Sequence, residues 1–217
     1  METAPDRYLR EHSSPQSEAL EWIEKQTHLR TNYPRMLSGS VQGKFLTLLV
    51  KMTGARSVLE IGSFTGYSAT CLAYGFPQKE DGEREGHIDA LELNDELQAL
   101  MTEGWKRAGV LDCISLHIGD ARESLKSLRD RRYDLVFIDA DKREYCEYYD
   151  AVIGMVDSGG VIVADDVLWD GKVYQEPMPH DRQTRGIASF NDMVASDPRV
   201  ENVILPLRDG LNIIRKL

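Results

Sequence analysis

The fold is decided by residues 57–68, which read SVLEIGSFTGYS. The first five of them suit a buried strand, the glycines Gly62 and Gly66 form a turn, and a helix should follow with Ser63 and Thr65 as its N-cap candidates. Glycine lets a ligand approach the backbone, and the first amides of a helix lack partners within the helix. This order of elements predicts a cradle for a nucleotide-like ligand.

The charge and glycine spacing of this stretch indicate the kind of ligand. The glycines are spaced G-x-x-x-G, whereas a dinucleotide fingerprint reads G-x-G-x-x-G. Glu60 stands just before the turn, where a carboxylate repels a pyrophosphate and suits an ammonium or sulfonium group. S-adenosylmethionine is therefore a better candidate than NAD, and a tight turn without any ligand is the alternative.

Composition narrows the class of protein. A chain of 217 residues with 41% hydrophobic residues can form one α/β domain, which we expect to span 1–217, with a helical front end over 1–56 and a core over 57–217. The 26 basic and 36 acidic residues give a net charge of −10. That charge argues against a basic surface for nucleic acid or anionic membranes, so small-molecule chemistry is favoured.

The chain carries no signal for export or for a disulfide framework. Residues 1–16 lack the apolar core of a signal peptide, and no window approaches a transmembrane run, so we expect a cytoplasmic protein. The cysteines Cys71, Cys113 and Cys146 fall in different elements without metal-type spacing. Buried free thiols are the expected state.

The periodicity predicts a front end of helices and then an alternation of strands and helices. One helix should begin after Pro15 at about residue 17, and another should cover 41–52. The expected strands are 57–61, 87–92, 114–118, 134–139 and 160–165, and the helices between them are near 66–75, 94–109, 121–129 and 144–156. Right-handed crossovers would then give a mainly parallel sheet with helices on both faces.

The end of the chain should return as a hairpin. A helix is expected over 181–196, followed by apolar runs at 201–207 and 211–217 that are joined by Arg208-Asp209-Gly210. Asp-Gly favours a hairpin turn, so the last two strands should be antiparallel. Residues 78–86, QKEDGEREG, have no packing pattern and should be a solvated loop.

Every expected parallel strand ends in a carboxylate. These are Glu60, Glu92, Asp120, Asp139 and the pair Asp165–Asp166. Ligands bind beyond the carboxyl ends of such strands, and so many like charges on one edge are costly unless cations lie among them. Glu92 is placed to accept ribose hydroxyls or is a surface acid, and Asp120 caps the next helix or also contacts adenine.

Three of these acids suit a metal ion. Asp139, Asp165 and Asp166 offer hard oxygen ligands for Mg²⁺, with Mn²⁺ or Ca²⁺ as alternatives, whereas no cysteine or histidine pair stands near for zinc. The pair Asp165–Asp166 could instead cap a turn. Lys142 follows three residues after Asp139; beside a cation its pKa should fall, which would make it a proton acceptor, and a plain salt bridge is the alternative.

With these residues in place, the chain resembles the class I S-adenosylmethionine-dependent, cation-dependent O-methyltransferases of the caffeoyl-coenzyme A and catechol type. The matching motifs are LEIGSFTGYS (59–68), ALEL (90–93), FIDADKREY (137–145), ADDVLWDGKV (164–173) and a tail with LPLRDGLNIIRK, and they span nearly all of 30–217. The resemblance implies a Rossmann-like α/β fold with a seven-stranded, mainly parallel sheet whose last strand is antiparallel.

The resemblance also implies roles for single residues. The methionine part of the cofactor would be held by Glu60, Gly62, Ser63 and Ser68, the ribose by Glu92, and the adenine by Asp120 and Ala121. The cofactor or substrate would further meet Met36, Ser38 and Asp139. The metal would be bound by Asp139, Asp165 and Asp166, with Lys142 and Asp139 catalytic and with Ser38, Lys142 and Trp169 at the substrate.

Two positions depart from the pattern of that family. Asp166 stands where the family has Asn, and Glu144 stands where another Asn is expected. The first change makes the metal shell more negative, which affects metal preference and the acidity of a bound substrate hydroxyl.

The expected function is transfer of a methyl group from S-adenosylmethionine to one hydroxyl of a vicinal diphenol. The partners we expect are this small molecule and a second copy of the chain in a homodimer, with no nucleic acid and no membrane. A non-catalytic protein that binds S-adenosylmethionine or a nucleotide is one alternative, and an NAD-dependent oxidoreductase is another. The oxidoreductase would explain Glu92 but neither Glu60 nor the three aspartates.

Overall fold

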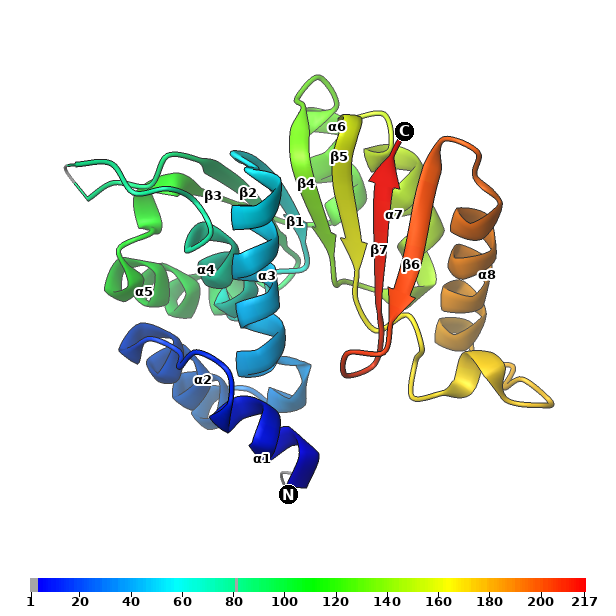
Figure 1. Ribbon diagram of the computed structural model, residues 1–217, viewed down its shortest axis with the longest axis horizontal. Helices are drawn as coiled ribbons and strands as arrows, with labels where there is room; N and C mark the ends of the chain where they lie inside the picture. Colours follow the sequence, from blue (N-terminus) through cyan, green and yellow to red (C-terminus); the bar gives the residue numbers. More distant parts are fainter. Residues whose placement is uncertain (1–3, 81) are drawn as a thin grey trace. The chain divides into compact units, whose positions relative to one another are not determined.

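The computed structural model describes residues 4–80 and 82–217, and its central feature is a seven-stranded sheet. The strand order is β3-β2-β1-β4-β5-β7-β6 (Figure 1). The strands are β1 (Ser57–Ile61), β2 (His87–Glu92), β3 (Ile114–Ile118), β4 (Tyr133–Ile138), β5 (Val156–Ala164), β6 (Val200–Leu205) and β7 (Leu211–Lys216). The first three coincide with the strands expected from the sequence, and β4 lies one residue earlier than expected.

The direction of β7 distinguishes it from its neighbours. It lies between β5 and β6 and is antiparallel to both, whereas β1 pairs with β4 and β4 with β5 in parallel (Figure 1). The prediction of a mainly parallel seven-stranded sheet with one antiparallel strand is confirmed.

The described residues form α-helices and five short 3₁₀ turns. The α-helices are α1 (Ala4–Glu11), α2 (Glu18–Arg30), α3 (Gly39–Thr53), α4 (Tyr67–Ala73), α5 (Gln98–Ala108), α6 (Ala121–Leu128), α7 (Tyr145–Val152) and α8 (Arg182–Ser196). The 3₁₀ turns are η1 (Pro34–Met36), η2 (Asp95–Leu97), η3 (Leu111–Cys113), η4 (Lys142–Glu144) and η5 (Lys172–Tyr174). The helices α1, α2 and α3 lie within residues 4–53, where the sequence analysis expects a helical front end, while residues 1–3 lie outside the described part of the chain.

The chain divides into two compact units. Of the described residues, the first unit contains 4–56, 63–80, 82–88 and 94–115, and the second contains 57–62, 89–93 and 116–217. The first unit consists mainly of helices, in which α2 contacts α5 and α3 contacts α4. The second unit holds nearly all of the sheet together with α6, α7 and α8.

The start of α4 corrects one expectation. Its N-cap is Gly66, with φ +79°, and neither Ser63 nor Thr65 takes that place. The Thr65 hydroxyl is engaged elsewhere, since it shares a 2.8 Å hydrogen bond with Thr27 of α2. Gly66 is required because an added Cβ would lie 2.6 Å from Nε1 of Trp105, which donates to the Gly66 carbonyl.

In the second unit an aromatic cluster joins α7 to α8. The rings of Tyr145 and Tyr149 on α7 meet the ring of Phe190 on α8 edge-on, at centroid distances of 5.4 and 6.0 Å. All three side chains are fully buried. Aromatic pairs of this kind stabilise the fold beyond the effect of the area that they bury, so the cluster strengthens the packing of α7 against α8.

Strand β5 begins four residues earlier than the sequence predicts. Val156 pairs with Tyr133, and the register then shifts before Leu135 pairs with Val161. The glycines Gly159 and Gly160 lie within this irregular part, and for this reason the apolar pattern becomes visible only from Val161 onward.

The C-terminal hairpin forms as predicted. Leu205 pairs with Leu211, and the turn is closed by a 3.0 Å hydrogen bond from the Gly210 amide to the Leu207 carbonyl. The loop 78–86 is largely exposed as expected, with one isolated bridge between Gln78 and Arg84, and its residue 81 lies outside the described part.

Two further expectations concern cysteines and membranes. Cys71 and Cys113 are buried free thiols, and Cys146 is a free thiol that is partly buried. Burial raises the pKa of Cys113 to about 11. Within the described ranges, no helix has both the length and the apolar character that a membrane span needs.

A buried acid on β2 joins three strands. Asp89 is 1% exposed and accepts hydrogen bonds from His117 Nε2 at 2.7 Å, from the hydroxyl of Tyr133 at 2.8 Å and from Arg131. Burial acts to raise the pKa of Asp89, but the hydrogen bonds from His117, Tyr133 and Arg131 outweigh it and leave the pKa lowered. The carboxylate therefore stabilises the folded state once it is ionised.

We predict that Asp89→Asn lowers the free energy of unfolding by about 2 kcal/mol at pH 7, because charged and neutral donors lose their buried acceptor. A lowered pKa means that this stabilisation is present above the ordinary value near 4 and is lost as the pH falls through the folded-state value. Urea titrations at pH 7 and pH 3.5 should therefore show a gap between variant and wild type that shrinks in acid. Asp157→Asn, at an exposed acid 3.7 Å from Arg132, is the control; an equal gap at both pH values would contradict this account.

Candidate active site

The site begins where β4 and β5 end side by side. Ile138 pairs with Ala164 at the last position of the two strands, so the next residues, Asp139 and Asp165, emerge together. The Asp165 amide donates to the Ile138 carbonyl at 2.9 Å, which holds the two exits together. Carboxylate oxygens of Asp139, Asp165 and Asp166 all lie within 4.8 Å of one another.

A buried lysine lies among these acids. Lys142, in η4, is 7% exposed, and its Nζ lies 2.7 Å from Oδ1 of Asp139 and 3.1 Å from Oδ2 of Asp166. Three carboxylates against one ammonium leave the group with a formal charge of −2. Oxygen atoms that converge in this way are the ligands that Mg²⁺, Mn²⁺ and Ca²⁺ take, so the residues present fit a divalent cation.

Tyr145 is a member of this group that the sequence analysis missed. Its hydroxyl accepts a 2.7 Å hydrogen bond from Lys142 Nζ and donates to the Asp165 carbonyl at 3.0 Å. These two hydrogen bonds tie the lysine to the end of β5, and the phenol that makes them is completely buried. Tyr145 stands six residues after Asp139, yet nothing in its local sequence distinguishes it from a packing aromatic.

The charges of the group shift the protonation of its members. Burial acts to lower the pKa of Lys142, but Asp139, Tyr145, Asp166 and Asp165 outweigh it and hold the pKa well above its ordinary value. The sequence analysis expects a lowered pKa at Lys142 only beside a cation; without one, the carboxylates stabilise the ammonium. Burial, together with Asp166, raises the pKa of Asp139.

Asp166 occupies an unusual backbone position. Its φ is +55°, in the left-handed region that Asn and Asp tolerate best after glycine. Its amide donates to Oδ1 of Asp165 at 2.8 Å, and its carbonyl accepts from the Trp169 amide at 3.2 Å, so the two acids stand at the start of a turn, as the alternative in the sequence analysis has it. Asp166 can form this turn and pair with Lys142 at the same time, because its backbone makes the turn and its carboxylate contacts the lysine.

Where the sequence analysis expects a cofactor, backbone hydrogen bonds align the ends of four strands in the second unit. The amide of Gly62 donates to Leu91, that of Asp139 to Ile61, and that of Gly119 to Glu92. Gly62 has φ +94°, and a Cβ there would lie 2.2 Å from the Asp139 carbonyl oxygen. The glycine is therefore required by the close approach of two backbone segments.

The other predicted cofactor residues of this unit vary in their surroundings. Glu60 is fully buried in β1, and Glu92 is half-buried at the end of β2. Asp120 caps α6 by accepting from the Arg122 amide at 2.9 Å, and the same Arg122 lowers the pKa of Asp120 to about 2. The capping role predicted for Asp120 is confirmed, and Ala121 is the first residue of that helix.

The remaining predicted residues fall outside the acidic group. In the first unit, Ser38 caps α3 without a side-chain hydrogen bond, Met36 is exposed in η1, and Ser63 and Ser68 are buried around the start of α4. In the second unit, Trp169 packs against the hydrophobic core, and Lys172 Nζ lies 5.7 Å from its ring centroid.

Glu144, the second departure from the family pattern, has a local structural partner. It accepts a 2.6 Å hydrogen bond from the hydroxyl of Tyr148, and its other oxygen lies 3.3 Å from Arg122 of α6. These contacts link η4, α6 and α7, so the glutamate supports the segment that carries Lys142.

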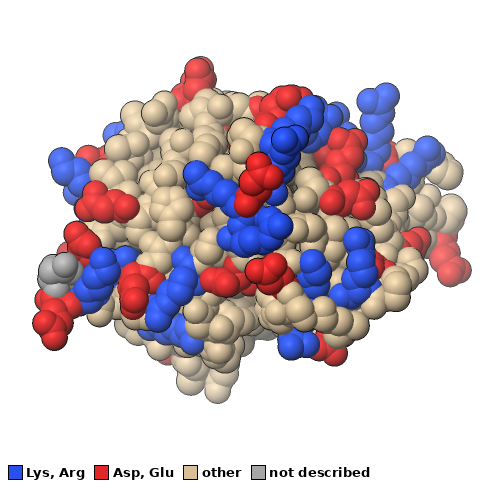
Figure 2. Space-filling model, turned by 90° about the horizontal axis from the view of Figure 1, so that it is seen from above, with Lys and Arg blue, Asp and Glu red and all other residues tan. Residues whose placement is uncertain are grey.

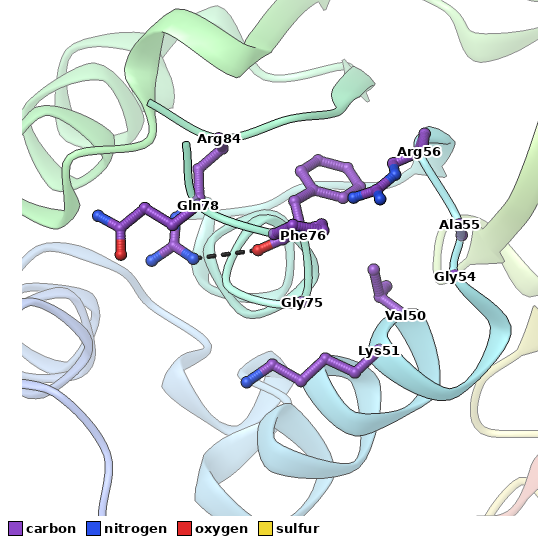
Figure 3. A pocket seen from close by; sticks show the side chains of 10 residues that line it. Val50, Lys51, Gly54, Ala55, Arg56, Gly75, Phe76, Gln78 and Arg84 are labelled. Carbon is purple, nitrogen blue, oxygen red and sulfur yellow. Dashed lines mark hydrogen bonds between the residues drawn. The ribbon is translucent and has the colours of Figure 1, made fainter. Parts of the chain in front are cut away.

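A separate hollow lies in the first unit, beside the C-terminal end of α3 (Figure 3). It measures about 420 Å³, and three of the residues that line it are the cations Lys51, Arg56 and Arg84. Arg84 donates to the Phe76 carbonyl at 3.1 Å, and Arg56 lies 3.7 Å from the Glu85 carboxylate. Two of its three cations are thus occupied by the chain itself.

On the face seen in Figure 2, acidic and basic side chains are intermixed. That face offers no continuous basic patch of the kind that binds a nucleic-acid backbone.

Comparison with known proteins places this geometry in a family. The family model described as O-methyltransferase matches residues 10–217. Tricin synthase 2 of Oryza sativa subsp. japonica is 34% identical over 85% of this chain and 65% of its own length. Caffeoyl-CoA O-methyltransferase 1 of Eucalyptus globulus is 34% identical over 84% of this chain and 75% of its own length. The chain thus spans 65% to 75% of the length of these plant relatives.

Solved structures give the same result. The O-methyltransferase from Bacillus cereus in complex with SAH has a TM-score of 0.90 and 29% identity, and the match covers 100% of this chain and 98% of that one. TomG from Streptomyces achromogenes in complex with SAM has a TM-score of 0.89 and 27% identity, with 99% and 96% covered. The chain belongs to the O-methyltransferase family, in the class that uses S-adenosylmethionine, and the resemblance seen in the sequence is confirmed.

We predict that Lys142→Met lowers the free energy of unfolding by about 3 kcal/mol at pH 8, because three carboxylates then lack their buried countercharge. The raised pKa of Asp139 means that acid neutralises this repulsion, so the loss should shrink as the pH falls toward 5. Thermal melts in EDTA at both pH values measure it. Lys126→Met, at a lysine 70% exposed beside Glu123, is the matched control. A loss of equal size at pH 5 and pH 8 would show that the lysine stabilises through packing alone.

Proposed function

We propose that this protein transfers the methyl group of S-adenosylmethionine to one hydroxyl of a vicinal diphenol, with a divalent cation held by Asp139, Asp165 and Asp166. The observation that carries the proposal is the convergence of these three carboxylates around Lys142 at the ends of β4 and β5. Neither a cofactor-binding protein without activity nor an NAD-dependent oxidoreductase needs such a group.

The three acids supply only oxygen atoms, which favours Mg²⁺ and leaves Mn²⁺ and Ca²⁺ as alternatives. A cation bound there would act as a Lewis acid on two adjacent phenolic oxygens and lower the pKa of the attacking hydroxyl. Two neighbouring oxygens on one ring satisfy this geometry, and for that reason a vicinal diphenol is the acceptor that we propose.

Lys142 is the proposed proton acceptor. Its high pKa in the present structure comes from Asp139, Tyr145, Asp166 and Asp165, which outweigh the opposite effect of burial. Once the charge of these carboxylates is neutralised, the ammonium loses most of its stabilisation, and burial then favours the neutral amine. Tyr145 would keep its own hydrogen bond with Nζ during this change, since its hydroxyl is fixed by the Asp165 carbonyl.

For the cofactor, we propose that Glu60, Gly62, Ser63 and Ser68 hold the methionine part and that Glu92 accepts the ribose hydroxyls. Asp120 and Ala121 would contact the adenine, and Met36, Ser38 and Asp139 would border the cofactor or substrate. The acids on this list suit the positive charge of the sulfonium and ammonium groups. Trp169 and Ser38 would bound the acceptor ring.

The names of the relatives support the acceptor class. Caffeoyl-CoA O-methyltransferase is named for an acceptor with a caffeoyl group, which carries two adjacent phenolic hydroxyls. In that acceptor the group is a coenzyme A ester, so both free diphenols and esters belong in a test. A single folded domain, a homodimer and a cytoplasmic location remain our predictions for this chain.

The decisive assay is a panel of diphenols with S-adenosylmethionine, with and without a chelator. We expect methylation of caffeate, caffeoyl-CoA or catechol, loss of turnover in EDTA, and recovery on addition of Mg²⁺ or Mn²⁺. Resorcinol, whose hydroxyls are not adjacent, should be inert because it cannot present both oxygens to one cation. Turnover that persists in EDTA would refute the cation, and equal turnover of resorcinol would refute the acceptor geometry.

A second prediction concerns Asp166, which replaces the family's Asn. Three carboxylates should bind the cation more tightly than two but blunt its effect on the substrate hydroxyl. We expect Asp166→Asn to keep activity, to need several-fold more Mg²⁺ for half-saturation, and at saturating metal to shift the acidic limb of the pH–rate profile to lower pH. Activity titrated against Mg²⁺ decides it: an unchanged requirement would mean that Asp166 only forms the turn.

A further inference from the structure

Helix α8 contacts both of the segments that carry the acidic group. Within the second unit it packs against η4, which contains Lys142. Its residue Gly186 lies against the backbone of η4, and its residue Asn191 binds the segment that follows Asp166. Each of these two contacts has a feature that the packing of a helix alone does not explain.

Gly186 allows two backbone segments to approach closely. It lies inside α8, where glycine is less favourable than alanine. A Cβ added to it would lie 2.9 Å from Cα of Arg143 and closer still to the carbonyl oxygen of Lys142. Because these are backbone atoms, they could make room only if the turn η4 moved. The glycine therefore sets the position of the turn that carries the lysine.

The same helix also holds the lysine through its side chain. The ring of Phe190, one helical turn after Gly186, meets the ring of Tyr145 edge-on at a centroid distance of 5.4 Å. Tyr145 in turn accepts the 2.7 Å hydrogen bond from Nζ of Lys142. The lysine is thus held by α8 at its backbone directly and at its ammonium group through Tyr145.

Asn191 holds the segment on the other side of the acidic group. Its Nδ2 donates a 2.8 Å hydrogen bond to the carbonyl of Val167, the residue directly after Asp166. Its Oδ1 is buried and has no hydrogen-bond partner among the described residues. A buried, unpaired oxygen destabilises the fold, so an apolar side chain would suit the packing better. We attribute the asparagine at this position to its bond with Val167.

We propose that α8 is the positioning element of the site, in which Gly186 places the proton acceptor Lys142. Through Val167, Asn191 places the metal ligand Asp166. The inference rests on the proposed function, from which the roles of the lysine and the aspartate are taken. One helix then fixes the separation between the group that takes the proton and a group that binds the cation. Such precision matters, because a displacement of about 1 Å can lower a rate 10²-fold.

The two positions should give different defects. Gly186→Ala should move η4 and lower kcat about 10- to 100-fold, because Lys142 no longer meets the acceptor hydroxyl. The Kd for Mn²⁺, measured without substrate by electron paramagnetic resonance, should change much less than kcat. Gly154→Ala is the matched control, since a Cβ added there would meet no described atom within 4 Å, and it should change neither quantity.

Asn191→Leu should show the opposite pattern. The leucine keeps the shape of the side chain but cannot donate to the Val167 carbonyl, so Asp166 is held less firmly. We expect the Kd for Mn²⁺ to rise about 10-fold, the lower end of the loss seen when a residue that supports a metal ligand is replaced. At saturating metal, kcat should change much less. Asn191→Gln, which keeps the amide on a longer side chain, should recover part of the affinity.

A further control separates positioning from a simple loss of stability. Val194→Ala, one turn after Phe190 in α8, leaves a cavity at a fully buried side chain and should lower the melting temperature. It should change neither kcat nor the Kd for Mn²⁺ when both are measured well below that temperature. If it reproduced the defects of Gly186→Ala and Asn191→Leu, the proposal would be overturned. Should Gly186→Ala fail to fold, the result for Asn191→Leu decides alone.

The proposed function is judged separately, on the wild type. If the wild type neither bound Mn²⁺ nor methylated any diphenol, the proposed function would fail, and the positioning roles would fail with it. If the wild type did both while Gly186→Ala kept its kcat and Asn191→Leu kept its Kd for Mn²⁺, only the role of α8 would be wrong.

Discussion

The ion-paired contact of one buried ammonium with two strand-end carboxylates is the interaction on which this site depends. Lys142 Nζ lies within 3.1 Å of both Asp139 and Asp166, and it is 7% exposed. Several acids this close would repel each other strongly in a medium of low dielectric constant. The lysine reduces the repulsion among these acids in the folded chain. The negative charge that remains favours binding of a cation to the three carboxylates.

The rest of the second unit can be understood as support for that contact. The parallel register of β4 and β5 brings Asp139 and Asp165 out together, and Tyr145 ties the lysine to the Asp165 carbonyl. The phenol is held in turn by the edge-on ring of Phe190. Antiparallel β7 then places its turn against the backbone that follows Asp166. A site of this kind is preorganised, because its side chains are locked by packing before any ligand arrives.

Much of this arrangement could be predicted from the sequence, and the reason is topological. Apolar runs bounded by glycine and acid reveal buried parallel strands, and the ends of such strands meet at one edge, so Asp139, Asp165 and Asp166 could be grouped without coordinates. Contacts that depend on tertiary packing could not be predicted. Tyr145 looks like any core aromatic, Gly66 is fixed by the distant Trp105, and the pKa of Lys142 depends on a cluster whose balance of charges only the fold defines.

The central claim is that the three carboxylates are ligands of one divalent cation, and the most direct test is to locate the ion. A crystal of the protein soaked in Mn²⁺ should show a single strong anomalous peak about 2.0–2.2 Å from oxygens of Asp139, Asp165 and Asp166, the distance expected for a small hard cation. Lys142 should then have left at least one of the carboxylate oxygens that it contacts here. A peak bound elsewhere, or no peak at this group while Lys142 keeps both contacts, would contradict the account.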